Sequence, residues 1–249
     1  MTKPFFAKTA RIAAAGAFVA FVAAGSASAL TLKYDGTVDN LGFEKIDMTT
    51  PTLTNVNTGG FKMKDTSNNN SFAVFCLDLL ASIYSGRSYG YEATNTPFTN
   101  GGVDLTVVDG GSGLSGIDRI QRIFDSSYDA AFDSLTNSAG FQLALWNAVY
   151  DVDWSVGDNS SGANGGTFYQ TDTDDEAVRT AANGFLSDAF AYNGGQKYSL
   201  TFLQSTGSTQ SPGRSQNLVT ASPVPLPAAG LMLLAGIGGL FVGRRRKKA

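Results

Sequence analysis

The sequence of 249 residues contains no histidine and a single cysteine, Cys76. Without histidine the chain can form neither a Ser-His-Asp nor a Cys-His catalytic centre, and it can form no zinc or copper site with histidine ligands. A single cysteine also excludes a disulfide within the chain, although exported proteins usually pair their cysteines. The sequence therefore argues against the commonest hydrolase mechanisms and requires another explanation for Cys76.

The first 29 residues have the features of a secretory signal peptide. Three basic residues precede an uncharged run over residues 12–25, and the small residues Ala27 and Ala29 occupy positions −3 and −1 of a cleavage site. A retained membrane anchor is the alternative, but the apolar run is shorter than a membrane-spanning helix. We expect cleavage by signal peptidase after Ala29 and export through the inner membrane.

The last 27 residues, 223–249, combine a short motif, an apolar stretch and a basic tail. Residues 224–243 are uncharged and long enough for one transmembrane helix, whose basic end should stay cytoplasmic under the positive-inside rule. The motif consists of Val224, Pro225, Leu226, Pro227 and Ala228, and the tail of Arg244, Arg245, Arg246, Lys247 and Lys248.

This segment resembles the VPLPA variant of the PEP-CTERM sorting signal of Gram-negative bacteria. The resemblance implies recognition by an exosortase-type membrane enzyme and removal of the helix. Contact with the inner membrane is then transient, and the protein ends at the cell surface, at the outer membrane or in the extracellular matrix.

Basic residues are scarce between these two ends. Eight of the 18 lie in the end segments, which leaves ten basic against all 21 acidic residues, a net charge of −11. Such a surface favours solubility, repels nucleic acid and suits cationic partners such as amines or polyamines. We expect no nucleic-acid partner.

The remaining chain has the length of one domain, over residues 30–203, followed by a flexible polar tether over 204–222. Period-2 alternation predicts strands, and apolar spacing of three and four predicts helices between them. The order indicates an α+β domain, a mainly antiparallel sheet or barrel with a helical insertion. The predicted strands are 30–36, 72–79, 103–108, 198–205 and 216–220, and the predicted helices are 114–132, 138–151 and 173–192.

Cys76 lies within an apolar run and has four candidate states. These are an inert buried thiol, an intermolecular disulfide, a lipid attachment and a bond to a side chain other than cysteine. Lipid attachment is disfavoured because Cys76 is far from the signal cleavage site. A candidate partner is Gln142, whose carboxamide interrupts the apolar surface of the helix 138–151 at a cost unless another group engages it.

Two short motifs resemble the thioester domains of bacterial surface adhesins, in which a cysteine after an aromatic residue is joined to the glutamine of a TQxAIW-like helix. Phe75 and Cys76 match the first motif, and Gln142, Ala144 and Trp146 match the second. Exported PEP-CTERM proteins often carry similar motifs. The chain departs from the adhesin pattern at Phe141, which replaces threonine, and at Asn147, which replaces an acidic residue common in the exported proteins.

The resemblance implies that the Cys76 thiol attacks the Gln142 carboxamide, expels ammonia and leaves a thioester that a lysine or polyamine amine can later open. Phe75 and Trp146 would exclude water. Asp78, on the same strand face as Cys76, would orient the amine or take its proton; an exposed turn carboxylate is the alternative. Without a thioester, Cys76 is an ordinary buried residue and Gln142 bonds to backbone.

Two acidic clusters carry oxygen atoms of the kind that calcium prefers, but neither fits an EF-hand loop, and we expect solvated carboxylates, no metal and no cofactor. The clusters are Asp151, Asp153, Asp158 and Asn159, and Asp172, Asp174, Asp175 and Glu176.

The sequence thus predicts an exported covalent adhesin that reacts with an amine-bearing surface protein or polyamine. The alternative is a non-covalent matrix protein of the same fold, associated with biofilm exopolysaccharide. An enzyme would need a carboxylate pair or metal that no spacing singles out, so we expect no enzyme.

The two end signals predict the mature form. Protein recovered from the cell surface should lack residues 1–29 and the apolar segment after about Pro227, because both are recognised and removed during export. Peptide mapping of the surface form checks this, and a surface form that still carries the segment "GLMLLAGIGGLFVG" would contradict it.

Overall fold

A computed structural model describes residues 28–49, 51–95, 98, 104–109, 111–151, 153–158, 168–170, 175–207 and 214–225. Most of the predicted signal peptide, including Ala27, lies outside these ranges, as do Leu226, Pro227, Ala228 and the basic tail. Within the ranges, no helix has both the length and the apolar character to cross a membrane.

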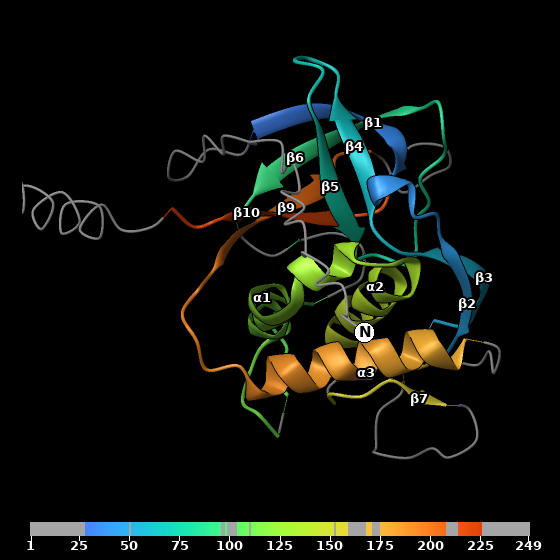
Figure 1. The fold of residues 1–249 in the computed structure, drawn as a ribbon. Coiled ribbons are helices and arrows are strands. Elements are labelled where there is room, and N and C mark those ends of the chain that lie inside the picture. Colours follow the sequence, from blue (N-terminus) through green and yellow to red (C-terminus); the bar gives the residue numbers. More distant parts are fainter. Residues whose placement is uncertain are drawn as a thin grey trace, which may run out of the picture.

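Six antiparallel strands form a closed barrel in the order β1-β4-β5-β10-β9-β6 (Figure 1). Closure leaves no unpaired sheet edge, and the strands come from both ends of the domain. The strands are β1 (Ser28–Thr37), β4 (Phe61–Asp65), β5 (Ser71–Cys76), β6 (Ser88–Thr94), β9 (Tyr198–Ser205) and β10 (Leu218–Pro223).

The chain between β6 and β9 forms a helical layer at one end of the barrel (Figure 1). It contains α1 (Gly116–Ser127), the 3-10 turn η2 (Asp129–Phe132), α2 (Leu135–Tyr150) and α3 (Glu176–Ala191). The barrel and the inserted helices confirm the predicted α+β class.

A second, small sheet lies beside the helices and has the order β3-β2-β8-β7 (Figure 1). It contains β2 (Glu44–Met48), β3 (Leu53–Thr58), β7 (Gly157–Asp158) and β8 (Tyr169–Gln170), and the 3-10 turn η1 (Val38–Asn40) precedes β2. The sequence prediction did not include this sheet, whose last two strands are only two residues long.

The predicted strand over 103–108 is wrong for the residues that the structure describes there. Asp104 accepts hydrogen bonds from the backbone N–H and the hydroxyl of Thr106, a local turn that competes with extended structure. Val107 and Val108 are 52% and 57% exposed, and Val108 makes only an isolated bridge to Ser115. The apolar alternation therefore does not correspond to a buried strand face.

The predicted tether over 204–222 is also wrong in its second half, where the strand predicted over 216–220 is present as β10, two to three residues further along the chain. Residues 218–223 form β10, which pairs with β9 over six residues and with β5 at Leu218↔Cys76 and Val219↔Phe75. Leu218 and Val219 are fully buried. The barrel domain therefore extends to Pro223, because the short run "LVT" supplies the strand that closes the sheet.

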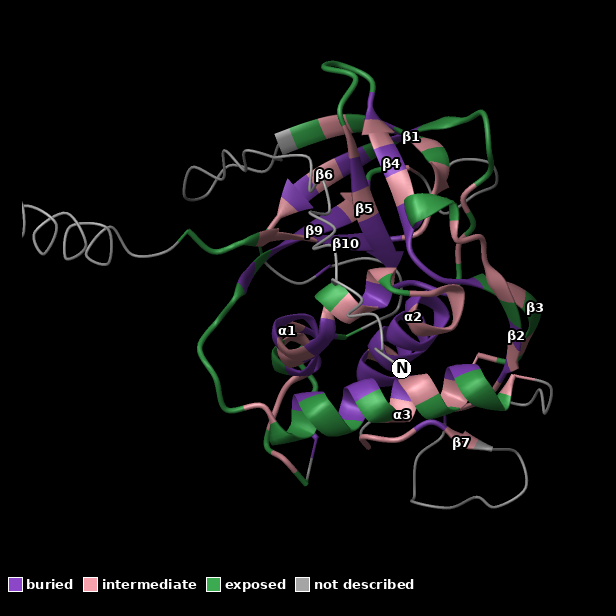
Figure 2. Cartoon of the chain, viewed as in Figure 1, coloured by how far each residue is buried: buried purple, intermediate pink, exposed green. Residues whose placement is uncertain are grey.

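The central helix of the molecule is α2, every residue of which from Ser138 to Ala148 is buried (Figure 2). It begins at Ser134, whose side chain accepts a hydrogen bond from Asn137 N, an N-cap of the usual kind. Gly140 permits close contact with α3, because a Cβ there would lie 2.7 Å from the Cβ of Ala181. A helix enclosed on all sides is mostly apolar around its whole circumference, and the few polar residues of α2, such as Gln142 and Asn147, are hydrogen-bonded.

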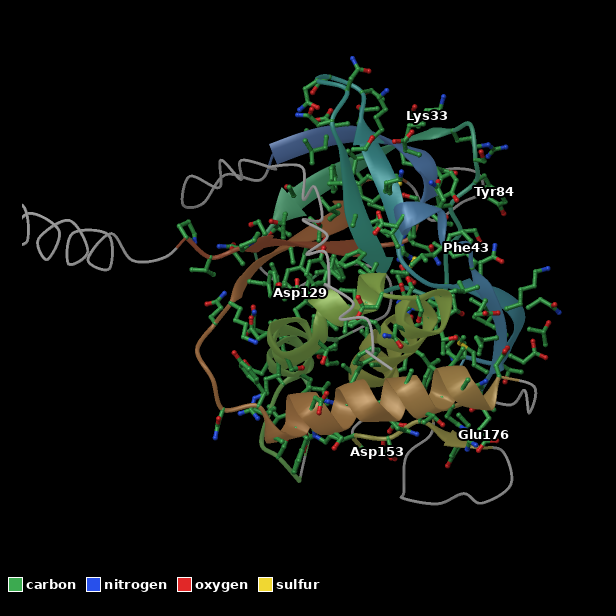
Figure 3. The ribbon with its side chains drawn as sticks, viewed as in Figure 1. Lys33, Phe43, Tyr84, Asp129, Asp153 and Glu176 are labelled. Atoms are coloured by element: carbon green, nitrogen blue, oxygen red, sulfur yellow. The ribbon has the colours of Figure 1, made fainter. Side chains whose placement is uncertain are left out.

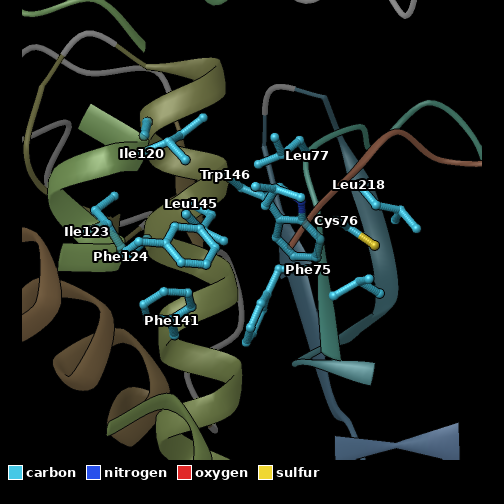
Figure 4. Close-up of a cluster of buried hydrophobic side chains, with 14 of the residues drawn as sticks. Phe75, Cys76, Leu77, Ile120, Ile123, Phe124, Phe141, Leu145, Trp146 and Leu218 are labelled. Carbon is cyan, nitrogen blue, oxygen red and sulfur yellow. The ribbon is translucent and has the colours of Figure 1, made fainter. Parts of the chain in front are cut away.

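Aromatic side chains fill the space between β5 and the helices (Figure 4). Phe75 packs against Phe141 with ring centroids 4.8 Å apart and against Phe124 at 6.3 Å. At the same boundary Asp129 accepts a 2.6 Å hydrogen bond from the Tyr198 hydroxyl (Figure 3). These contacts fix the orientation of the helical layer relative to the barrel.

The end of α2 is fixed by the buried Arg119. Its guanidinium donates to the Asp151 carbonyl at 2.6 Å and to Asn147 Oδ1 at 2.7 Å, and it also bonds the Asp153 carbonyl. Asp151 is itself buried, and its carboxylate accepts from Phe168 N at 2.7 Å. The prediction of a solvated carboxylate is therefore wrong for Asp151, which holds the chain after α2 in place.

Trp146 is 1% exposed, so Trp146→Ala should lower the free energy of unfolding by roughly 3–5 kcal/mol through lost burial and a residual cavity. Phe190→Ala is the matched control, because Phe190 is 56% exposed and its loss should cost less than about 1 kcal/mol. Denaturant unfolding measures both. Equal midpoints for Trp146→Ala and the wild type would contradict the central position of α2.

Candidate functional site

Cys76 is the last residue of β5, where the strand reaches the helical layer (Figure 4). Side chains alternate along a strand, so Cys76 and the aromatic anchor Phe75 point to opposite faces. Cys76 is 6% exposed, and burial raises the pKa of its thiol because the thiolate would lose its hydration. The thiol is therefore held in its neutral form.

The Gln142 carboxamide binds the backbone of Cys76 with both of its polar atoms. Oε1 accepts from Cys76 N at 2.8 Å, and Nε2 donates to Cys76 O at 2.7 Å. Gln142 is 1% exposed, so these bonds satisfy a carboxamide that would otherwise be costly to bury. The sequence prediction thus brought the correct two residues together, but Gln142 contacts the main chain of Cys76.

The carboxamide beside the thiol belongs to Gln216. The Cys76 Sγ–H donates to Gln216 Oε1 at a distance of 2.8 Å. Gln216 lies two residues before Leu218, the β10 residue that pairs with Cys76, and its side chain is partly exposed. The partner that the structure gives to the thiol is therefore Gln216, in place of the predicted Gln142.

Neighbouring groups fix the backbone on both sides of Gln216. The Tyr91 hydroxyl donates to Gln216 O at 3.2 Å, and Leu77 N donates to Asn217 O at 2.9 Å. Asn217 Oδ1 in turn accepts from Ser205 N at 2.9 Å. The barrel strands β6 and β9 and the segment after β5 therefore all hold this short stretch.

Asp78 is buried, so the predicted alternative of an exposed turn carboxylate is wrong. The predicted position on the strand face of Cys76 is also wrong, because β5 ends at Cys76. Asp78 lies two residues beyond the end of the strand, forms an ion pair with Arg214, and accepts from Leu80 N at 2.8 Å. The sequence reasoning identified Asp78 as a neighbour of the site but gave it the wrong surroundings, because Arg214 lies in the segment predicted as tether.

The segment after Cys76 is also held from α2. The hydroxyl of Tyr150, the last residue of α2, accepts from Leu79 N at 2.8 Å, and burial raises the pKa of Tyr150 to about 12. Trp146 extends from α2 towards Leu77 (Figure 4) and, like Ala144, has almost no exposed surface. The residues Phe75, Ala144 and Trp146 thus enclose the site from the helical side.

A thiol held in contact with a carboxamide has the geometry that acyl transfer requires, because both groups are fixed before reaction. Among the described residues, no three histidine, cysteine or acidic side chains gather as metal ligands would. Of the two acidic clusters in the sequence, Asp153 accepts hydrogen bonds from Asn147 and Ser155, and Asp175 is the N-cap residue of α3. Asn159, Asp172 and Asp174 lie outside the described ranges.

The chain matches no protein-family model and no curated protein. One similar solved structure is the N-terminal domain of the pilus tip adhesin Cpa of Streptococcus pyogenes, with 18% identity and a TM-score of 0.40 over 68% of this chain and 85% of that one. Another is the N-terminal thioester domain of a Clostridium perfringens surface protein, a cysteine-to-alanine variant, with 15% identity and a TM-score of 0.41 over 66% and 88%. Similarity of this degree identifies neither a family nor an activity.

Gln216 escaped prediction because it lies in a polar stretch rich in serine and glycine. The signal that points to it is its place directly before "NLVT", a run whose four residues are all buried. A glutamine shortly before a buried strand is a side chain that the fold can place beside a neighbouring strand.

The burial of the thiol predicts low native reactivity. The variant Gln216→Met keeps the side-chain length but has no acyl group, so Cys76 stays a free thiol. At about pH 8, Cys76 in the folded variant should react with iodoacetamide at least tenfold more slowly than in the unfolded variant. The raised pKa leaves little thiolate in the folded state, whereas unfolding restores an ordinary thiol. Equal alkylation rates in buffer and in guanidinium would contradict the buried, neutral thiol.

Proposed function

We propose that this chain is an exported surface or matrix protein whose domain forms an internal thioester between Cys76 and Gln216 and uses it to attach covalently to amines. The observation that carries the proposal is the contact between Cys76 Sγ and the Gln216 carboxamide oxygen. Export is supported by the predicted signal peptide and sorting signal. The resemblance of the motif around Cys76 to adhesin thioester domains supports a thioester at this cysteine, with Gln216 in the place of the Gln142 that the resemblance implied.

The bond-forming step needs no cofactor. The Cys76 sulfur attacks the Gln216 carboxamide carbon, the C–N bond breaks, and the thiol proton leaves with the nitrogen as ammonia. Fixed proximity lowers the barrier to this step, since it converts a bimolecular encounter into an intramolecular one. The backbone contacts on each side of the two residues provide that proximity.

In the attachment step the Cys76 sulfur is the leaving group. An uncharged primary amine attacks the acyl carbon, the C–S bond breaks, an amide forms on Gln216, and the proton lost by nitrogen ends on Cys76 as the thiol. The partly exposed Gln216 offers the approach, while the burial of Cys76, which is 6% exposed, keeps most water from the sulfur. A lysine of a surface protein or a polyamine has the required group, and the acidic domain attracts such cations.

Intact mass tests the proposal. The exported chain should weigh less than its sequence by one ammonia, and its thiol should resist alkylation even after unfolding. Methylamine should add one methylamine to the mass and release the thiol, because it opens the thioester.

Cys76→Ala and Gln216→Met should each abolish the mass deficit without loss of fold, and Leu80→Ala is the control, since Leu80 is close in sequence but 61% exposed. A freshly prepared wild-type chain with full mass and one titratable thiol would refute the thioester and leave the non-covalent matrix role.

A further inference from the structure

The two segments that carry the reacting side chains are joined by a buried ion pair. Asp78 follows Cys76 by two residues, and Arg214 precedes Gln216 by two residues. The Asp78 side chain is 1% exposed and that of Arg214 11% exposed, and their charged groups contact each other directly. The pair thus spans the same two segments as the thiol and its acyl partner.

The strand pairing by itself secures these segments weakly. β10 pairs with β9 along its whole length, from Leu218↔Leu203 to Pro223↔Tyr198, but it pairs with β5 at only two positions. Gln216 lies before β10 begins, beyond both ladders. Its alignment with Cys76 therefore depends on contacts other than the strand pairing.

A buried ion pair is a poor source of stability, because desolvation of both charges offsets their attraction. It does impose a defined geometry, since each charge must remain opposite the other. The Asp78 carboxylate is further fixed by its 2.8 Å bond from Leu80 N. Its position is therefore better explained by alignment of the segment 214–217 than by stabilisation of the barrel.

We propose that the Asp78–Arg214 ion pair is a positioning device that aligns the Gln216 carboxamide with the Cys76 thiol for thioester formation. The inference rests on the proposed function. Neither residue takes part in bond changes, because Asp78 is occupied by Arg214 and by Leu80, while the thiol proton is directed at Gln216. Loss of the pair should slow thioester formation while β10 remains paired with β9.

The test compares chains carrying Asp78→Asn, Arg214→Met, both changes together, and Arg214→Lys. Each chain is synthesised and isolated in denaturant, so that no thioester has formed, and is then refolded and followed by intact mass for the loss of one ammonia. The single neutral variants and the double variant should form the thioester roughly 10–100-fold more slowly than the wild type, as expected for a small misplacement of reacting groups. Arg214→Lys, which keeps the charge, should recover part of the rate. Arg87→Gln is the control, since Arg87 is exposed and lies with Asp78 in the loop between β5 and β6.

Unfolding midpoints separate alignment from stability. The double variant buries no unpaired charge, so its midpoint should return close to that of the wild type while the thioester still forms slowly. A double variant that recovers both the midpoint and the rate would overturn the positioning role, as would wild-type rates in both single variants. A wild-type chain that never loses ammonia would overturn the proposed function and this inference together, whereas a normal wild type with unaffected variants overturns the inference alone.

Discussion

The two hydrogen bonds between the Gln142 carboxamide and the backbone of Cys76 are the contact on which the site depends. They join the centre of α2 to the last residue of β5, and both bonds are buried and short. In a low-dielectric interior, loss of either partner leaves an unsatisfied polar group, so the position of Cys76 is strongly fixed. The helical layer therefore sets the position of the thiol, and it leaves the sulfur free to face the barrel strand next to β5.

The opposite side of the site depends on how the barrel closes. β10 enters between β5 and β9, and Gln216 is placed by the few residues that precede it. Cys76 and Gln216 are 140 residues apart in the sequence, so their contact depends on closure of the barrel. The helical insertion between β6 and β9 separates the two halves of the site in the sequence, and the proposed reaction would therefore follow folding.

The sequence predicted the three helices and four of the six barrel strands, but it did not predict β4 or β6. β9 matches its predicted range, and the helix with Gln142 and Trp146 was identified from its apolar spacing. Besides β4 and β6, whose buried residues alternate, the strands of the second sheet were missed. The buried pair Asp78–Arg214 and the contact of Gln216 were also missed, because both depend on tertiary proximity. The resemblance to adhesin motifs pointed to Cys76 and Gln142, which are in contact, but spacing alone does not distinguish a carboxamide that binds backbone from one that faces the thiol.

The most direct test of the account is to locate the modified side chain after reaction with methylamine. The exported chain is treated with the amine, digested, and its peptides are sequenced by fragmentation in the mass spectrometer. The account predicts a single methylamide at Gln216, with an unmodified Gln142 and a free Cys76 thiol. A methylamide at Gln142, or at neither glutamine, would contradict it.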